Sequence, residues 1–245
     1  MTLAHDFHGP EDAPVLVLPC SLGTNRELWE PALFSSAYRV LRVELRGHGA
    51  SPAPAGPYSI PDLAHDVVEL LDELGLEKVC VCGLSLGGMV AMWLGVHVPE
   101  RLRLLVLACT SARVQAPDAY AKRAALVREQ GIEPVADEVV SRWFSDLTPS
   151  AKRARFREIL VTTAPEGYAG CCEALAAWDF REELSELPVP ALVIAGEADE
   201  ATPKADTDLL AERIPRTRLV VLPGAAHLAN VERPREFANA VLEAA

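Results

Sequence analysis

The sequence lacks a long apolar run, and this absence limits where the protein can reside. No stretch reaches the roughly 18 apolar residues that a membrane span requires. Residues 1–14 carry acidic side chains and histidines, and the apolar run 15–18 that follows them is too short for the core of a signal peptide. We therefore predict a cytoplasmic protein that does not bind membranes.

The sequence is also short of positive charge. It has 23 lysines and arginines against 35 aspartates and glutamates, which gives a formal net charge of −12. A protein of this charge repels nucleic acids and anionic membrane surfaces at long range. We predict no nucleic-acid partner, and we expect any anionic substrate to need a local cation in its binding pocket.

Cysteine patterns that build disulfide frameworks or metal sites are missing as well. The six cysteines lie mainly in apolar, strand-like runs of a large chain, which favours buried reduced thiols over disulfides. Cys80 and Cys82 are one residue too close for a zinc-type C-x-x-C pair, and no cluster of cysteine and histidine completes a site elsewhere. The sequence therefore predicts no metal.

What is present is an alternation of strand-like and helical patterns over 245 residues, a length typical of one large α/β domain. Near-continuous apolar runs predict parallel strands with helices on both faces. The predicted strands span 15–18, 39–44, 78–82, 103–109, 191–195 and 218–222. Helices are predicted over 60–74, from about 88 to about 98, and from about 234. No strand is predicted before residue 15.

Residues 115–187 interrupt this alternation with several consecutive helical patterns. The expected helices span 118–129, 134–144, 150–162 and 167–177, and no convincing strand lies among them. A helical block between two strands of a sheet is typical of a cap. We predict an α/β core formed by residues 1–114 and 188–245, with a mostly parallel sheet flanked by helices and a helical cap of residues 115–187 inserted before the penultimate strand.

Ser85 is the predicted nucleophile. It lies at the centre of the pentapeptide 83–87 (Gly-Leu-Ser-Leu-Gly), directly after a predicted strand and before a predicted helix, which is the context of a nucleophile elbow. The elbow, with the predicted core and cap, predicts the α/β-hydrolase fold. The sharp turn strains the serine and needs small neighbours, hence Gly83 and Gly87. The alternative is a serine that caps a helix after a glycine turn.

A serine hydroxyl needs a histidine base, and in this fold the partners follow in the order serine, acid, histidine. His227 lies in a loop after the predicted strand 218–222, whereas His97 lies about three helical turns beyond Ser85, too far to reach it. Asp199, in the loop after strand 191–195, is the predicted acid that orients the imidazole. Glu197 and Glu200 are rivals in the same loop.

The oxyanion formed during acyl transfer needs two backbone N–H donors. Leu86, at the start of the helix after Ser85, is the first candidate, and Leu22, in the loop after strand 15–18, is the second. Ser21 is a candidate to orient a substrate oxygen. His48, in the sequence Arg-Gly-His-Gly at 46–49, belongs to a predicted structural turn and is not expected to act in catalysis.

Five segments together resemble the 3-oxoadipate enol-lactonase family, over residues from about 15 to 234: 21–24 (SLGT), 83–88 (GLSLGG), 109–113 (CTSAR), 167–170 (GYAG) and 196–203 (GEADEATP). The resemblance implies an enzyme that opens 3-oxoadipate enol-lactone to 3-oxoadipate in the β-ketoadipate pathway of aromatic catabolism. It also implies a Ser85–Asp199–His227 triad, an oxyanion hole at Leu22 and Leu86, and no cofactor.

The anionic lactone implied by this resemblance needs a cation in the pocket of a strongly negative protein. Arg142, beside Trp143 in the predicted cap, is the first choice, and both are predicted to bind substrate; the alternative cations are Arg113, Arg26 and Lys204. Two other functions stay open: a broad carboxylesterase or C–C hydrolase with the same triad, and a non-catalytic small-molecule receptor on a hydrolase scaffold. The sequence also leaves a homo-oligomer open.

Overall fold

Seven strands form one sheet in the computed structural model of the chain, which describes residues 1–244. Their order across the sheet is β1-β3-β2-β4-β5-β6-β7. Six strands are parallel, and β1 runs antiparallel to β3 at one edge. The strands are β1 (His5–His8), β2 (Val15–Pro19), β3 (Arg39–Val43), β4 (Val79–Leu84), β5 (Leu102–Ala108), β6 (Ala191–Gly196) and β7 (Thr217–Leu222).

The sequence did not predict β1, and its surroundings explain why. Its four residues are His-Asp-Phe-His, all of them half-buried, so neither an apolar run nor a clear alternation marks them as a strand. Pairing with β3 stabilises it, and the Arg42 guanidinium donates two hydrogen bonds to the Asp6 carboxylate across that pair (2.9 and 2.7 Å). The other six strands lie within two residues of their predicted bounds.

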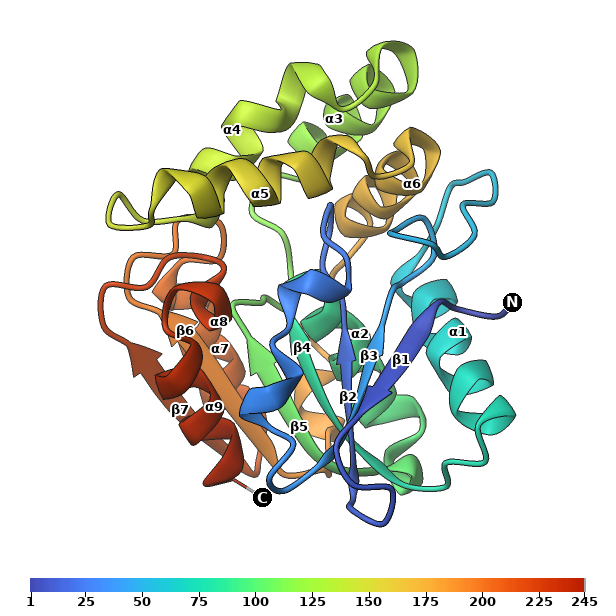
Figure 1. The fold of residues 1–245 in the computed structure, drawn as a ribbon, viewed down its shortest axis with the longest axis vertical. Helices are drawn as coiled ribbons and strands as arrows, with labels where there is room; N and C mark the ends of the chain where they lie inside the picture. The colour runs from blue at the N-terminus through green and yellow to red at the C-terminus, as the bar shows by residue number, and fades with distance from the viewer. Residues whose placement is uncertain (245) are drawn as a thin grey trace.

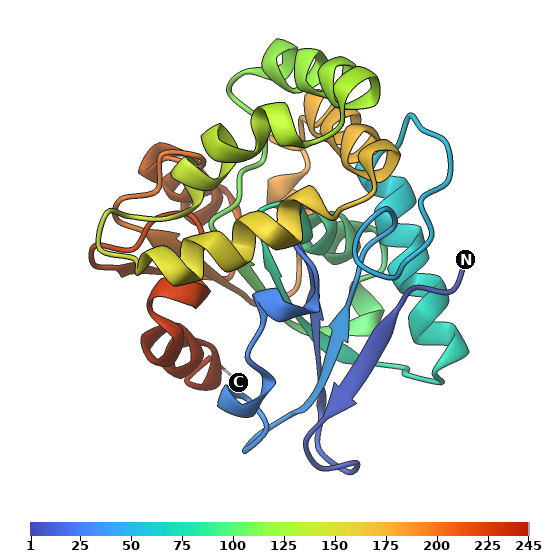
Figure 2. The same cartoon turned by 45° about the horizontal axis from the view of Figure 1, so that its top comes forward.

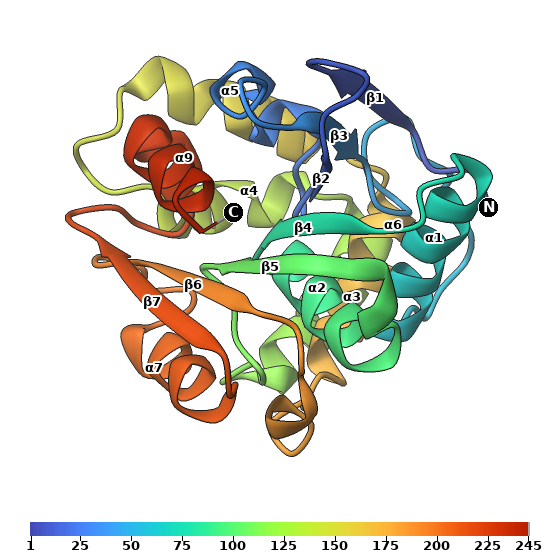
Figure 3. The same ribbon diagram turned by 90° about the horizontal axis from the view of Figure 1, so that it is seen from below.

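Helices cover both faces of the sheet (Figure 3). One face is covered by α1, α2 and α7, and α9 lies on the other. The helices of the core are α1 (Ile60–Glu73), α2 (Leu86–His97), α7 (Lys204–Arg213), α8 (Ala229–Glu232) and α9 (Pro234–Leu242).

Strand β2 shows why its residues are apolar without interruption. All five are buried, and they alternate between the two hydrophobic cores. Val15 and Val17 pack into the core under α1 and α2, whereas Leu16 and Leu18 pack into the core on the other face. A central parallel strand must be apolar on both sides, because both sides are covered.

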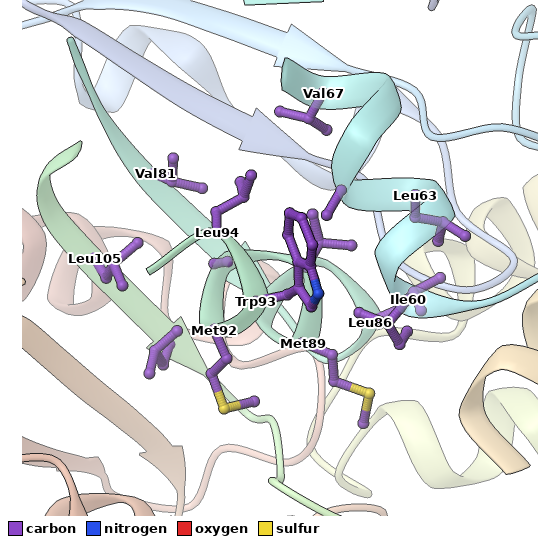
Figure 4. Packing of buried hydrophobic residues seen from close by; sticks show 14 of the residues in the cluster. Ile60, Leu63, Val67, Val81, Leu86, Met89, Met92, Trp93, Leu94 and Leu105 are labelled. Atoms are coloured by element: carbon purple, nitrogen blue, oxygen red, sulfur yellow. The ribbon is translucent and has the colours of Figure 1, made fainter. Parts of the chain in front are cut away.

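Helix α2 carries the segment after Ser85 into the middle of the molecule. Every residue from Leu86 to Gly95 is buried. Figure 4 shows Met89, Trp93 and Leu94 of this helix among side chains of α1 and of strands β4 and β5. The start of α2 is thereby fixed against the sheet, and the turn that precedes it has a rigid support.

Four further helices lie between β5 and β6, over the carboxyl ends of the strands (Figures 1 and 2). They are α3 (Pro117–Gln130), α4 (Glu133–Trp143), α5 (Ser150–Val161) and α6 (Pro165–Ala176), and we call them the cap. The predicted fold class is confirmed: a mostly parallel sheet, flanked by helices, with a helical cap before the penultimate strand β6. The domain division into 1–114 with 188–245 and 115–187 stays a prediction.

Candidate active site

Ser85 lies at a strained turn between β4 and α2. Its φ of 53° and ψ of −114° are unusual for a residue with a side chain. A Cβ on Gly83 would lie 2.1 Å from the carbonyl oxygen of Gly87, so only glycine fits there. The turn is held from outside, since Ser85 N donates to Ala108 O (2.9 Å) and Thr110 Oγ1 donates to Ser85 O (2.8 Å).

The two predicted oxyanion donors lie on either side of this turn. Leu86 begins α2, where backbone N–H groups have no helical partner. Leu22 lies in the loop after β2 and borders a cavity that Ser85 also lines. A Cβ on Gly87 would lie 3.2 Å from Cys20 O, so the loop and the turn are in close approach. This arrangement suits a pair of donors beside Ser85 Oγ.

His48 supports the loop that carries Leu22. Its Nε2 accepts a hydrogen bond from Gly23 N (2.9 Å), and its Nδ1 lies 3.1 Å from Arg46 O. Burial lowers the pKa of His48 to about 4, so the ring is neutral near pH 7 and can accept from Gly23 while it donates to Arg46. The residue lies outside the cavity, and its contacts give it a supporting position in the turn.

His227 and Asp199 form a buried pair. His227 Nδ1 lies 2.9 Å from Asp199 Oδ2 and 3.2 Å from Oδ1. The carboxylate also accepts from Ala201 N (2.8 Å), Thr202 N (3.0 Å) and Thr202 Oγ1 (2.5 Å). Burial alone would raise the pKa of Asp199, but His227 and Thr202 outweigh it and the pKa is lowered. The anionic form is therefore favoured as the partner of the imidazole.

The structure separates Asp199 from its rivals. Glu197 Oε2 accepts from Gly224 N (2.8 Å), and the side chain of Glu200 is exposed in the same loop. His97 stacks on Trp93, with ring centroids 4.2 Å apart. Only the predicted acid meets the predicted base among the residues that the structure describes.

Ser85 and His227 line a cavity of about 80 Å³ between the sheet and the cap. A smaller adjoining cavity of about 40 Å³ shares both residues and is bordered by Ser21, Leu22 and Trp143. Within residues 1–244, Ser85 Oγ makes no hydrogen bond to the imidazole. The candidate nucleophile and base nevertheless lie on the same cavity. A hydrogen bond between a catalytic serine and its histidine is often long or absent without substrate and tightens when substrate is bound.

Two arginines of the cap border both cavities. Arg142, the predicted cation, donates to Glu200 O (3.4 Å), and no carboxylate of residues 1–244 lies within ion-pair distance of it. Arg123, on α3, is the second, and the sequence did not single it out. Its side chain is only 13% exposed, its guanidinium lies 5.2 Å from the ring centroid of Tyr120, and its Nη2 lies 3.7 Å from Glu138 Oε1.

The alternative cations lie elsewhere. Arg26 pairs with Asp6 and Glu44, and Lys204 pairs with Asp208. Arg113 is exposed, and neither it nor the other two lines the cavities beside Ser85. These arginines and the lysine are therefore poor candidates to hold a substrate carboxylate.

Known proteins resemble the chain over nearly its whole length. Residues 8–240 match the alpha/beta hydrolase family. The chain is 42% identical to 3-oxoadipate enol-lactonase 2 of Acinetobacter baylyi, over 98% of this chain and 92% of that protein. The chain belongs to the alpha/beta hydrolase family.

Solved structures show the same relationship. The enol-lactonase from Burkholderia xenovorans LB400 superposes on this hydrolase with a TM-score of 0.96 and 38% identity, over 99% of this chain and 95% of the other. A thermophilic esterase from Thermogutta terrifontis, solved with malate bound, gives a TM-score of 0.92 and 29% identity, over 98% and 92%. The predicted resemblance to the enol-lactonases is thus confirmed as a similarity.

Two more residues of this hydrolase reach the cavity without a signal in the sequence. Asp206, in the first turn of α7, is 7% exposed, and its Oδ1 accepts from the Gln115 amide (2.6 Å). Burial raises the pKa of Asp206, and Asp199 adds to the effect. The two residues lie 91 positions apart, so only the fold could reveal the contact.

Trp143 contacts both the smaller cavity and the buried core of this hydrolase. It borders the smaller cavity, yet it is only 6% exposed and packs into the core between the cap and the sheet. Its predicted contact with substrate stays a prediction. No group of three or more potential metal ligands occurs among residues 1–244, and no helix in that range is long and apolar enough to cross a membrane.

Proposed function

We propose that this protein hydrolyses 3-oxoadipate enol-lactone to 3-oxoadipate, with Ser85 as nucleophile, His227 as base and Asp199 as the acid that orients it. One observation carries the proposal: the cavity that holds Ser85 and His227 is also bordered by two cap arginines. The relatives that bear the name enol-lactonase cover almost the whole chain and support the same substrate.

The arginines give the cavity the charge that the substrate requires. The whole protein is strongly negative, so an anion gains nothing from the overall field. Arg123 and Arg142 supply guanidinium donors at the cavity, and a carboxylate is the partner that a guanidinium fork binds best. A structural neighbour solved with malate, itself a carboxylate, is in keeping with an anion site in this fold.

The size of the cavity favours a compact substrate. At about 80 Å³, with a side cavity of about 40 Å³, it suits a small ring better than a long acyl chain. The substrate would place its ring carbonyl at Ser85 and its side-chain carboxylate toward the cap.

In the first half of the proposed reaction, Ser85 Oγ forms a bond to the lactone carbonyl carbon while its proton passes to His227. The resulting oxyanion lies between the N–H groups of Leu22 and Leu86. When it collapses, the ring C–O bond breaks and the enol oxygen leaves with a proton from His227. An enol is a better leaving group than an alkyl alcohol, and it isomerises to the ketone.

In the second half, water attacks the acyl-serine ester and gives its proton to His227. The ester C–O bond breaks, Ser85 recovers its proton, and the product leaves with one more carboxylate than the substrate had. Asp199 stabilises the imidazolium in both halves and remains ionised throughout.

The direct test measures loss of the enol-lactone in the ultraviolet for the wild type and for Ser85→Ala. We expect rapid loss with the wild type and loss at the uncatalysed rate with the variant. Absence of lactone loss with the wild-type protein would contradict the substrate and leave the fold assignment intact.

The cation assignment is tested with Arg123→Ala and Arg142→Ala. Each removes a charge-assisted contact, and we expect KM for the lactone to rise about tenfold or more. Lys122→Ala, at the exposed neighbour of Arg123 on the same helix, removes the same charge outside the cavity and is the matched control. If Lys122→Ala raises KM for the lactone as much as Arg123→Ala does, the rise reflects the overall charge of the protein and the assignment of Arg123 is wrong.

Two other functions predict different results. A broad carboxylesterase or C–C hydrolase with the same triad would turn over a neutral ester faster than the carboxylated lactone. A receptor on a hydrolase scaffold would keep its biological activity in Ser85→Ala. The arginine-lined cavity favours the carboxylated lactone over a neutral ester, and membership in a hydrolase family favours an enzyme over a receptor.

A further inference from the structure

Glu232 joins the loop of the predicted base to the cap. It is the last residue of α8, five positions after His227, and its side chain is directed into the junction between these two parts of the active site. Figure 1 shows the turn between α4 and α5 beside the segment that carries α8. Glu232 belongs to neither the predicted triad nor the predicted oxyanion hole.

The two carboxylate oxygens of Glu232 face different partners. Oε2 accepts a hydrogen bond from Ala226 N (2.5 Å), immediately before His227. Oε1 accepts from Ser145 N (2.9 Å), from Ser145 Oγ (2.7 Å) and from Thr148 Oγ1, all in the α4–α5 turn of the cap. One carboxylate thus bridges the base loop and the cap.

Further bonds close the same junction. Leu228 N, immediately after His227, donates to Trp143 O (2.9 Å), and Lys152 Nζ donates to Val231 O (2.9 Å). The residues on both sides of His227, Ala226 and Leu228, are therefore held by hydrogen bonds. The bond from Leu228 ends at Trp143, the neighbour of Arg142 in the chain. We call Glu232 with Ser145 and Thr148 the clasp.

The clasp differs from a surface ion pair. Burial alone would raise the pKa of Glu232, but the hydrogen bonds from Thr148, Ala226 and Ser145 outweigh it, so the pKa is lowered and the carboxylate is ionised near pH 7. Hydrogen bonds to a charged acceptor are stronger than those between neutral groups. Its partners are backbone and hydroxyl groups that hold a defined geometry.

We propose that Glu232 is a positioning residue. It fixes the loop of His227 to the cap turn that follows Arg142, so that His227 and Arg142 keep the same position relative to each other. The part that concerns the base requires only a serine hydrolase. The part that concerns Arg142 rests on the proposed function, because it assumes that Arg142 binds the substrate anion.

The test compares two chromogenic esters, neutral p-nitrophenyl acetate and the anionic mono-p-nitrophenyl ester of succinic acid. In Glu232→Gln the amide cannot accept on both sides, and its N–H₂ group opposes a backbone donor. We expect kcat to fall about 10- to 100-fold on both esters, because a base displaced by about 1 Å loses that much rate. A role in stability alone would lower the melting temperature and leave kcat of the folded fraction unchanged.

A second variant, Ser145→Ala with Thr148→Val, removes only hydroxyl groups on the cap side. It leaves the hydrogen bond from Ala226 N to Glu232 in place, so it loosens the cap turn that follows Arg142. We expect KM for the anionic ester to rise about 2- to 10-fold, the equivalent of one or two hydrogen bonds, and to rise more than KM for the neutral ester. Glu236→Gln, at an exposed glutamate on α9, is the control and should match the wild type.

The proposal is overturned if folded Glu232→Gln keeps kcat on the neutral ester within about twofold of the wild type, since a displaced base must cost more. Equal rises of KM on both esters in the cap-side variant would overturn the link to Arg142. That variant decides the link even if Glu232→Gln does not fold. The wild type could fail to hydrolyse the enol-lactone while Glu232→Gln still lowers kcat on p-nitrophenyl acetate. That result would contradict the proposed substrate and leave the positioning role of Glu232 intact.

Discussion

The sheet side supplies Ser85 and His227 to the cavity, with Asp199 bonded to His227, whereas the cap supplies Arg123 and Arg142. The residues from the sheet are held by buried contacts. Ser85 is fixed in an unusual backbone conformation between a strand and an all-buried helix, and Asp199 is enclosed by hydrogen bonds. The sheet side of the site has little freedom to move.

The cap side packs on the core through buried apolar side chains, such as Leu160 and Tyr168 beside Gly23, and ion pairs near solvent surround this contact. Arg155 on α5 pairs with Glu27 of the core, and both side chains are about half exposed. Arg128 on α3 pairs with Glu166 and Glu173 of α6, within the cap itself. Exposed ion pairs of this kind contribute little and are screened by salt.

The contrast teaches that the proposed chemistry and the proposed selectivity have different structural supports. Reaction geometry depends on a rigid, dry sheet end, and recognition of the anion depends on helices that lie over it. Substitutions on the sheet side should therefore cost rate or folding, whereas substitutions on the cap side should mainly change substrate affinity.

The largest expected effect is that of Asp199→Asn on the sheet side. The amide cannot hold the imidazole in the required tautomer or stabilise its cation, so kcat should fall about 10⁴-fold. Turnover of p-nitrophenyl acetate and of the lactone should fall together, while Glu197→Gln in the same loop should have a small effect. A loss no greater than that of Arg142→Ala would break the contrast between the two sides.

Gly83→Ala tests how rigid the elbow is. A Cβ there would lie 2.1 Å from Gly87 O, so we expect the free energy of unfolding in urea to fall by more than about 3 kcal/mol. Gly75→Ala is the control, because its φ of 65° is strained but no atom lies within 4 Å of the new Cβ. A loss at Gly83 no greater than that at Gly75 would show that the close approach to Gly87 does not limit the elbow.

His48 should make the sheet side sensitive to acid. Its pKa is about 4 in the folded chain and about 6.5 in the unfolded chain, so the unfolded chain binds the proton first as the pH falls. The contribution is complete above pH 6.5 and is lost toward pH 4, by about 1 to 3 kcal/mol. Urea unfolding at pH 7 and pH 4.5 should show a smaller pH effect in His48→Ala than in the wild type.

His65→Gln, at an exposed histidine, is the control for this comparison and should keep the wild-type pH dependence. An unchanged pH effect in His48→Ala would mean that groups other than His48 dominate the loss of stability between pH 7 and pH 4.5.

The smallest effect is expected for Glu27→Gln, which removes the ion pair between the core and α5. Because both partners are about half exposed, we expect the melting temperature to change by no more than about 2 °C and the difference to vanish at 1 M salt. A large change in KM for the anionic substrate, with no change in melting temperature, would sharpen the contrast, because it would show that even weak cap contacts set affinity.

The sequence predicted most of the sheet side. Apolar runs identified six strands, because a strand buried on both faces must be apolar throughout. The glycines around Ser85 identified the elbow, because that turn tolerates no other residue at 83. Strand β1 escaped prediction, since a four-residue polar edge strand is stabilised by its pairing and not by its own composition.

The cap side was less predictable. The helices were found, but Arg123 is one of several basic residues on α3 and differs from Lys122 only in where the folded helix points it. The same holds for Asp206 with Gln115 and for the clasp at Glu232, whose partners are 84 to 87 positions away in the chain.

The sequence by itself determined six of the seven strands, the elbow and the identity of Ser85 as the candidate nucleophile, because each depends on local rules of burial and backbone strain. It named Asp199 and His227 from their places after strands, but the tertiary structure decided that Asp199 rather than Glu197 meets the imidazole. Only the tertiary structure decided which arginines face Ser85, because charged groups on a helix surface are alike until packing buries one side of the helix.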